Sequence, residues 1–337
     1  MRYIASPIYK HTMQFRTEVK ISKSEFKISH NQRGITVGSC FTTYIGDYLK
    51  NAKFPIMVNP LGTVYNPISV CNSLDIITGK RKLIEVDVHN ENGIWQSYLL
   101  HSSFSALEKK KVFDACNKVQ HEFATKFQKL DYVIVSLGTA WVYELKRTKD
   151  IVSNCHKSPS NLFDRKRLSF DEIFKKLVEQ MFKLRQINPD LHIIFTISPI
   201  RHWKDGAHEN NVSKAALLLA VNDLIRLYKN TSYFPAYEIM MDDLRDYRFY
   251  EEDMLHPSKQ AVEYIWEKFT ETYFTKETQE VNKKITEIQK AVEHRPFQKE
   301  SEEYVKFLQK HVELCNEILS QNPEISLQKE LQFLQGK

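Results

Sequence analysis

A strand that turns directly into a helix is visible in Ile35-Thr36-Val37-Gly38-Ser39-Cys40-Phe41-Thr42-Thr43-Tyr44-Ile45-Gly46-Asp47-Tyr48-Leu49. Residues 35–38 are typical of a short buried strand, and from Thr42 to Leu49 apolar residues recur at helical spacing. Gly38 permits a tight turn between the two elements. Ser39 then lies at a helix N-terminus, where free backbone N–H groups and the positive end of the helix dipole favour developing negative charge.

Outward from this unit, short apolar strands alternate with longer amphipathic helices. We predict strands at 56–58, 132–137, 193–197 and within 233–239, a β-hairpin over 84–100 around Asn90-Glu91-Asn92-Gly93, and helices at 67–78, 106–129, 170–186, 212–229 and 258–269. This alternation indicates a parallel sheet covered on both faces. The predicted fold class is therefore α/β, a three-layer α/β/α sandwich with a parallel central sheet.

Composition changes mark three regions. Residues 1–33 are polar and irregular and are predicted to form an N-terminal arm, and 34–275 form the main domain. Residues 276–337 are rich in Glu, Lys and Gln with apolar residues at helical spacing, interrupted at Pro296 and Pro323. We interpret them as a helical C-terminal appendage. It either packs against the main domain or forms an oligomer or partner interface.

Charge and cysteine usage exclude several classes of protein. The 48 basic and 42 acidic residues give a net charge of +6 and are interspersed, which is unlike a nucleic-acid-binding footprint. The 5 cysteines are scattered without a CxxC, which argues against a disulfide framework or a cysteine-only zinc site. Without an apolar run of membrane-spanning or signal-peptide length, we expect a soluble cytoplasmic protein with no integral membrane segment.

Two polar clusters fall where strands end, which is where parallel α/β sheets bind ligands. The first is Ser39. The second is Asp253-Met254-Leu255-His256-Pro257, on a turn that leads into a helix. An Asp three residues before a His can orient the imidazole through one ring nitrogen, leaving the other free to take a serine proton. The alternatives are a serine that only caps its helix and a turn that only caps the next one.

The sequence resembles the GSCFA-domain proteins, a branch of the SGNH (GDSL-like) hydrolases, whose name matches residues 38–42 except that Thr42 replaces an alanine. Further matches follow in order: Asn59-Pro60-Leu61-Gly62-Thr63-Val64-Tyr65-Asn66-Pro67, Ser136-Leu137-Gly138-Thr139-Ala140, Asn154-Cys155-His156-Lys157, Ser198-Pro199-Ile200-Arg201-His202 and Tyr247-Arg248-Phe249-Tyr250. The resemblance implies a flavodoxin-like SGNH hydrolase fold. It also implies that Ser39 is the nucleophile, that Asp253 and His256 form its base pair, and that the N–H of Gly62 joins that of Ser39 in the oxyanion hole.

One expected oxyanion donor is missing. The superfamily's third block supplies an asparagine two residues after a glycine, whereas Gly138 is followed by Thr139 and Ala140. Thr139 or Asn154 is the candidate replacement, and we favour Thr139.

Other side chains allow competing interpretations. Cys40 is a rival nucleophile, although its side chain should point away from that of Ser39. Cys155, His156, His202 and His208 suggest zinc, but their spacing fits no standard structural zinc pattern, so we expect no metal.

We expect His156, Arg201 and His202 instead to line the pocket and bind polar or anionic substrate groups. Trp95, Trp141 and Trp203 are either a sugar-stacking surface or core residues. His192, at the start of an apolar strand, is expected to be structural.

These features predict a serine-dependent ester hydrolase that acts on O-acyl groups of a carbohydrate or lipid through an acyl-Ser39 intermediate, without a cofactor. An acyltransferase using the same acyl-serine is the alternative enzyme. A catalytically silent glycan- or lipid-binding module is the alternative from another class. A homo-oligomer through the C-terminal helices is the alternative to their packing against the main domain.

Overall fold

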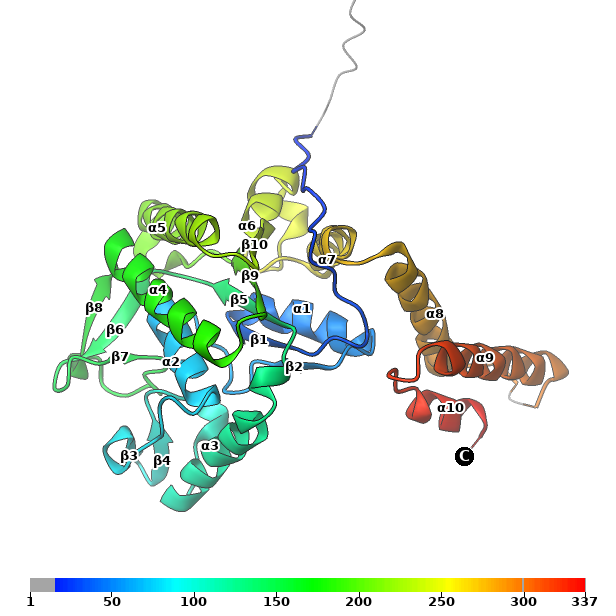
Figure 1. Ribbon diagram of the computed structural model, residues 1–337, viewed down its shortest axis with the longest axis horizontal. Helices are drawn as coiled ribbons and strands as arrows, with labels where there is room; N and C mark the ends of the chain where they lie inside the picture. The colour runs from blue at the N-terminus through cyan, green and yellow to red at the C-terminus, as the bar shows by residue number, and fades with distance from the viewer. Residues whose placement is uncertain (1–15, 299, 337) are drawn as a thin grey trace, which may run out of the picture.

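A five-stranded parallel sheet forms the centre of the computed structural model, which describes residues 16–298 and 300–336. Its strand order is β10-β9-β5-β1-β2 (Figure 1). The strands are β1 (Gly34–Gly38), β2 (Ile56–Val58), β5 (Tyr132–Leu137), β9 (His192–Ile197) and β10 (Thr231–Phe234). This order puts β1 and β5 side by side near the middle, so the ends of both open onto the same edge of the sheet.

Helices cover both faces of the sheet, because alternate strand residues point to opposite faces. Val133 and Val135 of β5 belong to one core, while Tyr132 and Ile134 belong to the other. The first core contains α2 (Pro67–Ile77), α3 (Lys109–Ala124), α4 (Phe170–Ile187) and α5 (Gly206–Leu227), and the second contains α1 (Cys40–Asn51) and α7 (Lys259–Tyr273). The predicted three-layer α/β/α fold is confirmed.

Three predicted elements have different bounds in the structure. The helix expected over 106–129 is α3 with a separate 3₁₀ turn at Phe127–Lys129, and the helix expected from Val212 begins at Gly206. Polar residues fill the first turns of α5, so the apolar period does not reveal them. The strand expected within 233–239 ends at Phe234, because Pro235 has no N–H to continue the ladder. The hairpin is confirmed as β3 (Val88–Glu91) and β4 (Ile94–Ser97).

A three-stranded antiparallel sheet was not predicted. It consists of β6 (Trp141–Leu145), β7 (Ile151–Val152) and β8 (Phe163–Arg167), in the order β7-β6-β8. Strand β8 has the sequence FDRKR and buries only its phenylalanine fully, so it lacks the alternating apolar pattern of a strand. This sheet follows β5 in the sequence and lies beside the carboxyl end of the central sheet (Figure 1).

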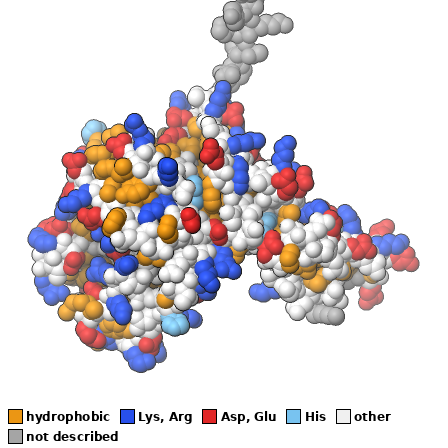
Figure 2. Space-filling model, viewed as in Figure 1, with side chains coloured by type: hydrophobic (Ala, Val, Ile, Leu, Met, Phe, Trp, Pro, Cys, Tyr) orange, Lys and Arg blue, Asp and Glu red, His pale blue; other side chains and the backbone are white. Residues whose placement is uncertain are grey.

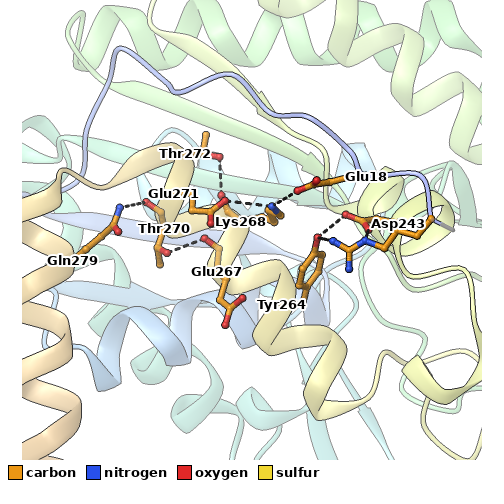
Figure 3. Close-up of polar contacts among 10 residues, drawn as sticks. Glu18, Asp243, Tyr264, Glu267, Lys268, Thr270, Glu271, Thr272 and Gln279 are labelled. Carbon is orange, nitrogen blue, oxygen red and sulfur yellow. Dashed lines mark hydrogen bonds and ion pairs between the residues drawn. The ribbon is translucent and has the colours of Figure 1, made fainter. Parts of the chain in front are cut away.

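The N-terminal segment from Arg16 onward lies along α7 (Figure 3). Arg16 Nε is 3.0 Å from Asp243 Oδ1, and Lys268 Nζ is 2.9 Å from Glu18 Oε1. Ile28 is fully buried in the second core. The described part of the predicted arm is therefore packed against the main domain, and residues 1–15 lie outside the described residues.

The C-terminal region is helical, as predicted, and has a core of its own. It contains α8 (Lys276–Glu293), α9 (Glu302–Gln321) and α10 (Gln328–Leu334), packed around Ile285, Ile288, Ala291, Cys315, Ile318, Ile325, Leu327 and Leu334. We call these three helices the C-terminal lobe; it stands off from the main domain (Figures 1 and 2). Polar contacts join the two parts, including a 2.6 Å hydrogen bond from Gln289 Nε2 to Asn51 O and an ion pair between Lys53 and Glu330.

Among the described helices, none combines the length and apolar character needed to cross a membrane. On the face in Figure 2, acidic and basic side chains are mixed and form no block of one sign.

Candidate active site

The turn that carries Ser39 is held against strand β5. Gly38 has a φ of +144°, and a Cβ there would lie 2.2 Å from the carbonyl oxygen of Ser136, so the position requires glycine. Ser39 is the N-cap of α1 and accepts a hydrogen bond from the N–H of Phe41 at 3.3 Å. The sequence therefore places the serine at the carboxyl end of β1, as predicted.

Asn59, at the end of β2, fixes this turn from the neighbouring strand. Its Oδ1 accepts from the N–H of Gly38 at 3.0 Å and from Thr42 Oγ1 at 3.2 Å, and its Nδ2 donates to Thr43 Oγ1 at 3.0 Å. No role was predicted for Asn59 from the sequence. A polar residue directly after a short apolar strand is the signal that could have identified it.

Ser39 opens into a cavity of about 850 Å³, which we call the substrate cavity. Its floor comes from the ends of β1, β5 and β9, and His256 lies on its rim. The unpredicted antiparallel sheet supplies Trp141, Tyr143, Phe163 and Arg165 to its wall. The volume lies within the usual range for small-ligand sites.

The predicted base pair is formed as expected. Nδ1 of His256 lies 2.5 Å from Oδ2 of Asp253, and Oδ1 of Asp253 accepts from the N–H groups of Leu255 and His256 at 2.9 Å each. These contacts, led by the backbone N–H of His256 and followed by its ring, lower the pKa of Asp253 to about 2. Asp253 is therefore ionised at neutral pH and holds the ring through Nδ1, and Nε2 takes no part in this contact.

The hydroxyl of Ser39 points toward β5 and not toward His256. Its Oγ is 2.8 Å from Oγ of Ser136, which is fully buried, and no hydrogen bond joins Ser39 to His256 within the described residues. Sγ of the rival nucleophile Cys40 lies 3.4 Å from the hydroxyl of Tyr65. The two candidate nucleophiles thus line one cavity but point in different directions, as predicted for Cys40.

Gly62 does not have the role predicted for it. Its N–H donates to the carbonyl of Asn59 at 2.8 Å, and Gly62 does not line the substrate cavity. Its φ is +83°, and a Cβ there would lie 2.1 Å from Cβ of His101. The glycine is needed for this turn and to make room for His101, and its amide is already used.

The hydrogen bonds also distinguish between Thr139 and Asn154, the two candidates for the missing oxyanion donor. Thr139 is fully engaged: its N–H donates to Tyr65 O at 3.1 Å, while Oγ1 accepts from the N–H of Trp141 and pairs with Ser213, both at 3.1 Å. Asn154 also lines the cavity and uses its Oδ1 to accept from a backbone N–H at 2.8 Å. Its Nδ2 has no partner among the described residues, so Asn154 has the available donor.

The backbone N–H groups near Ser39 also differ in whether they already have a hydrogen-bond acceptor. That of Ser39 donates to Ser136 O at 3.2 Å. Those of Cys40 and Thr63, which also line the cavity, have no acceptor within the described part of the chain.

Family models match most of the sequence. One described as the GSCFA family matches residues 33–269, and one described as GSCFA domain protein, C-terminal domain, matches residues 285–337. The chain belongs to the GSCFA family. A search of curated proteins found no match.

Solved structures that resemble this GSCFA protein include three esterases. An acetyl xylan esterase from Butyrivibrio proteoclasticus has 10% identity over 71% of this chain and 63% of its own, with a TM-score of 0.37. A carbohydrate esterase family 3 protein from Talaromyces cellulolyticus has 10% identity over 76% and 99%, with a TM-score of 0.37. A family two carbohydrate esterase from Clostridium thermocellum has 13% identity over 74% and 65%, with a TM-score of 0.33. Likeness at this level does not bear on activity.

The residues predicted to bind substrate are only partly brought together in this GSCFA protein. Arg201 and His202 line the substrate cavity, but His156 does not. Nε2 of His156 lies 2.8 Å from Ser97 O, and burial lowers the pKa of the ring. His156 is therefore a neutral residue that fixes the backbone behind the cavity, and its prediction as a substrate ligand was wrong.

The structure also bears on the alternatives considered for the three tryptophans and for zinc. Trp141 and Trp203 line the cavity, whereas Trp95 lies outside it, with Lys109 Nζ 5.3 Å from its ring centre. Within the described residues, the histidines and cysteine considered as zinc ligands are not gathered into a group of three.

A buried polar face of α5 supports the site and was missed by the sequence analysis. It consists of Asn210, Ser213 and Lys214, each at most 2% exposed. Lys214 Nζ donates to the carbonyls of Gly138, Ser198 and Ile200 at 2.8, 2.6 and 3.0 Å, which ties together the chain after β5 and the chain after β9. Burial lowers its pKa to about 7. Polar residues at positions i, i+3 and i+4 of one helix are the signal that could have identified this face.

Proposed function

We propose that this GSCFA protein is a serine ester hydrolase that acts on O-acyl groups of a carbohydrate or lipid. The observation that carries the proposal is that Ser39 and His256 line one cavity, with His256 oriented by Asp253. A nucleophile, a base and a residue that orients the base are the set required for acyl transfer.

The proposed reaction begins when the Ser39 hydroxyl rotates away from Ser136 and toward Nε2 of His256. Nε2 takes the hydroxyl proton as Oγ bonds to the ester carbonyl carbon. The bond from that carbon to the alcohol oxygen then breaks, and the departing oxygen takes the proton from His256. Water next gives a proton to Nε2 and attacks the acyl carbon. The bond from that carbon to Oγ of Ser39 then breaks, Oγ takes the proton back from Nε2, and the acid leaves, while ionised Asp253 stabilises the imidazolium in each half of the reaction.

The oxyanion in this proposal is held by Asn154 Nδ2 together with backbone N–H groups of the nucleophile turn. A fixed donor at this position typically contributes roughly 10²–10³ to the rate. The reaction requires no metal or organic cofactor.

Two other functions lead to different results in one experiment. An acyltransferase would form the same acyl-Ser39 but pass it to an acceptor hydroxyl, for which a cavity of about 850 Å³ has room beside the acyl group. In a catalytically silent binding module, the hydroxyl of Ser39 would keep its contact with Ser136, and no covalent product would form.

The test is intact mass after treatment with a fluorophosphonate probe. Wild type should gain one label, mapped to Ser39, and Ser39→Ala should gain none. Cys40→Ala is the matched control and should still be labelled. A folded wild type that takes no label, or a label on Cys40, would refute the serine mechanism.

A further inference from the structure

The substrate cavity has a positive wall. Its described lining residues include Arg165, Arg201 and Lys204 but no Asp or Glu. Two of these cations are already engaged: Arg165 pairs with Asp205, and Lys204 bonds the hydroxyl of Tyr143.

Arg201, like Lys204, has no carboxylate partner within the described residues. One Nη donates to Oδ1 of Asn211 at 3.0 Å, and the guanidinium lies 4.8 Å from the ring centre of Trp203. Its Nε is buried and has no hydrogen-bond acceptor among the described residues. Stacking and one hydrogen bond therefore hold the guanidinium in place while most of its donors stay free.

A second cation lies behind Arg201. Lys214 is 1% exposed, and its three acceptors are neutral carbonyls, one of which belongs to Ile200 next to Arg201. Burial, and then the charge of Arg201, lower its pKa. The guanidinium of Arg201 keeps its charge at neutral pH and has no carboxylate partner among the described residues, so an anion in the cavity would compensate this charge and that of the protonated fraction of Lys214.

We propose that the ester substrate carries a carboxylate that binds Arg201, most simply as an O-acylated acidic sugar. The inference rests on the proposed function for the position of the ester. Ser39 follows β1 and Arg201 follows β9, with β5 between them, so the strands that carry the two residues are about 10 Å apart. Trp141 and Trp203 also line the cavity, and their aromatic rings suit contact with a sugar ring.

Matched ester pairs test the proposal and locate the carboxylate. The first pair is methyl glucoside and methyl glucuronide with the same O-acetyl groups, which places the charge in the alcohol. The second is 4-nitrophenyl butyrate and 4-nitrophenyl hemiglutarate, which places it in the acyl group. We expect wild type to prefer the acidic sugar over its neutral partner by at least about tenfold in kcat/KM, with no such preference in the second pair. Arg201→Gln should lose most of this preference, whereas Arg226→Gln, an exposed arginine near the end of α5, should keep it.

Binding is measured separately, so that the proposal does not depend on turnover. Glucuronate should change the tryptophan fluorescence of wild type saturably, since Trp203 lies against Arg201, and the change should be lost in Arg201→Gln. Glucose should have no such effect. Labelling at Ser39 with no preference in either pair, a preference only in the acyl pair, or a preference unchanged in Arg201→Gln would overturn the acidic-sugar proposal and leave the hydrolase intact. An unlabelled wild type that still binds glucuronate through Arg201 would overturn the hydrolase proposal alone. An unlabelled wild type that does not bind glucuronate would overturn both the hydrolase and the acidic-sugar proposals.

Discussion

Asn154 and Thr139 both line the substrate cavity, but only Asn154 has a side-chain donor without a partner among the described residues. We therefore expect Asn154→Ala to lower kcat by roughly 10²–10³, or about 2.7–4 kcal/mol in barrier, with little change in KM, because the donor acts in the transition state. The measurement is steady-state kinetics on an ester that wild type hydrolyses.

Thr139→Val is the matched comparison. It removes a hydroxyl that accepts from Trp141 and pairs with Ser213, so its main effect should be a loss of unfolding free energy of about 1–3 kcal/mol. A larger fall in kcat for folded Thr139→Val than for Asn154→Ala would return the donor role to Thr139.

At the residue scale, the sequence predicted the catalytic candidates better than the groups that support them. Ser39, Asp253 and His256 were predicted because each belongs to a short motif before a helix. Ser39 does lie at the end of a strand, but Asp253 and His256 lie on a turn before α7 that follows no strand, contrary to the expectation. The role of Gly62 was wrong because a motif identifies a glycine but does not reveal whether its N–H is already bonded within a turn. Asn59 was missed because its bonds reach a turn that precedes it by about twenty residues.

Among the elements, helix α5 controls the shape of the cavity floor through Lys214. Lys214→Met should lower the unfolding free energy by about 3 kcal/mol or more, because three buried carbonyls would each lose a donor. Chemical denaturation measures this, with Lys229→Met, an exposed lysine just after α5, as the control. A loss below about 1 kcal/mol would mean that water replaces the ammonium and that the clamp is dispensable.

Strand β9 begins with a histidine whose burial makes stability depend on pH. His192 stacks on Phe26 of the N-terminal segment at 4.0 Å, and burial lowers its pKa to about 4. Between pH 6.5 and 4 the unfolded chain takes up a proton that the native ring does not, so stability falls as pH decreases through this window. The effect of this one ring is at most about 3 kcal/mol.

His192→Gln should flatten the dependence of unfolding free energy on pH between 6.5 and 4. His208→Gln, at an exposed position of α5, should not. Equal slopes for wild type and His192→Gln in urea unfolding at each pH would contradict the assignment.

The elements differ in how much of them the sequence could reveal. The central strands are buried on both sides and form continuous apolar runs, so their type and order of occurrence were predictable. The sheet of β6 to β8 was not, because strand β8 has charged residues on both faces: Arg165 lines the cavity, while Asp164 and Lys166 are exposed.

For the whole molecule, the C-terminal lobe is separate from the chemistry. Among residues 16–298 and 300–336, its core contains no residue of the main domain, and no residue that lines the substrate cavity comes from it. A chain ending at Thr275 should therefore still fold and accept the fluorophosphonate label, at a rate within about twofold of the full chain. Circular dichroism checks folding and intact mass measures the label.

A truncated chain that folds but takes no label would show that the lobe supports the site. The three-layer arrangement of the main domain followed from the alternation of strands and helices. How the lobe is attached did not, because a few polar contacts such as that of Gln289 with Asn51 leave no pattern in the sequence.

The contact between Ser39 and Ser136 also has a consequence for biosynthesis. The two residues are separated by 97 positions, so the nucleophile turn cannot close when Ser39 leaves the ribosome. At typical elongation rates of about 5–20 residues per second, synthesis of the chain between Ser39 and Ser136 takes roughly 5–20 seconds. During that interval β1 has no strand β5 to pair with, and its apolar side chains have no sheet to enter. Nascent chains that stop before Leu137 are therefore expected to be prone to aggregation, and those that extend beyond it can close the turn.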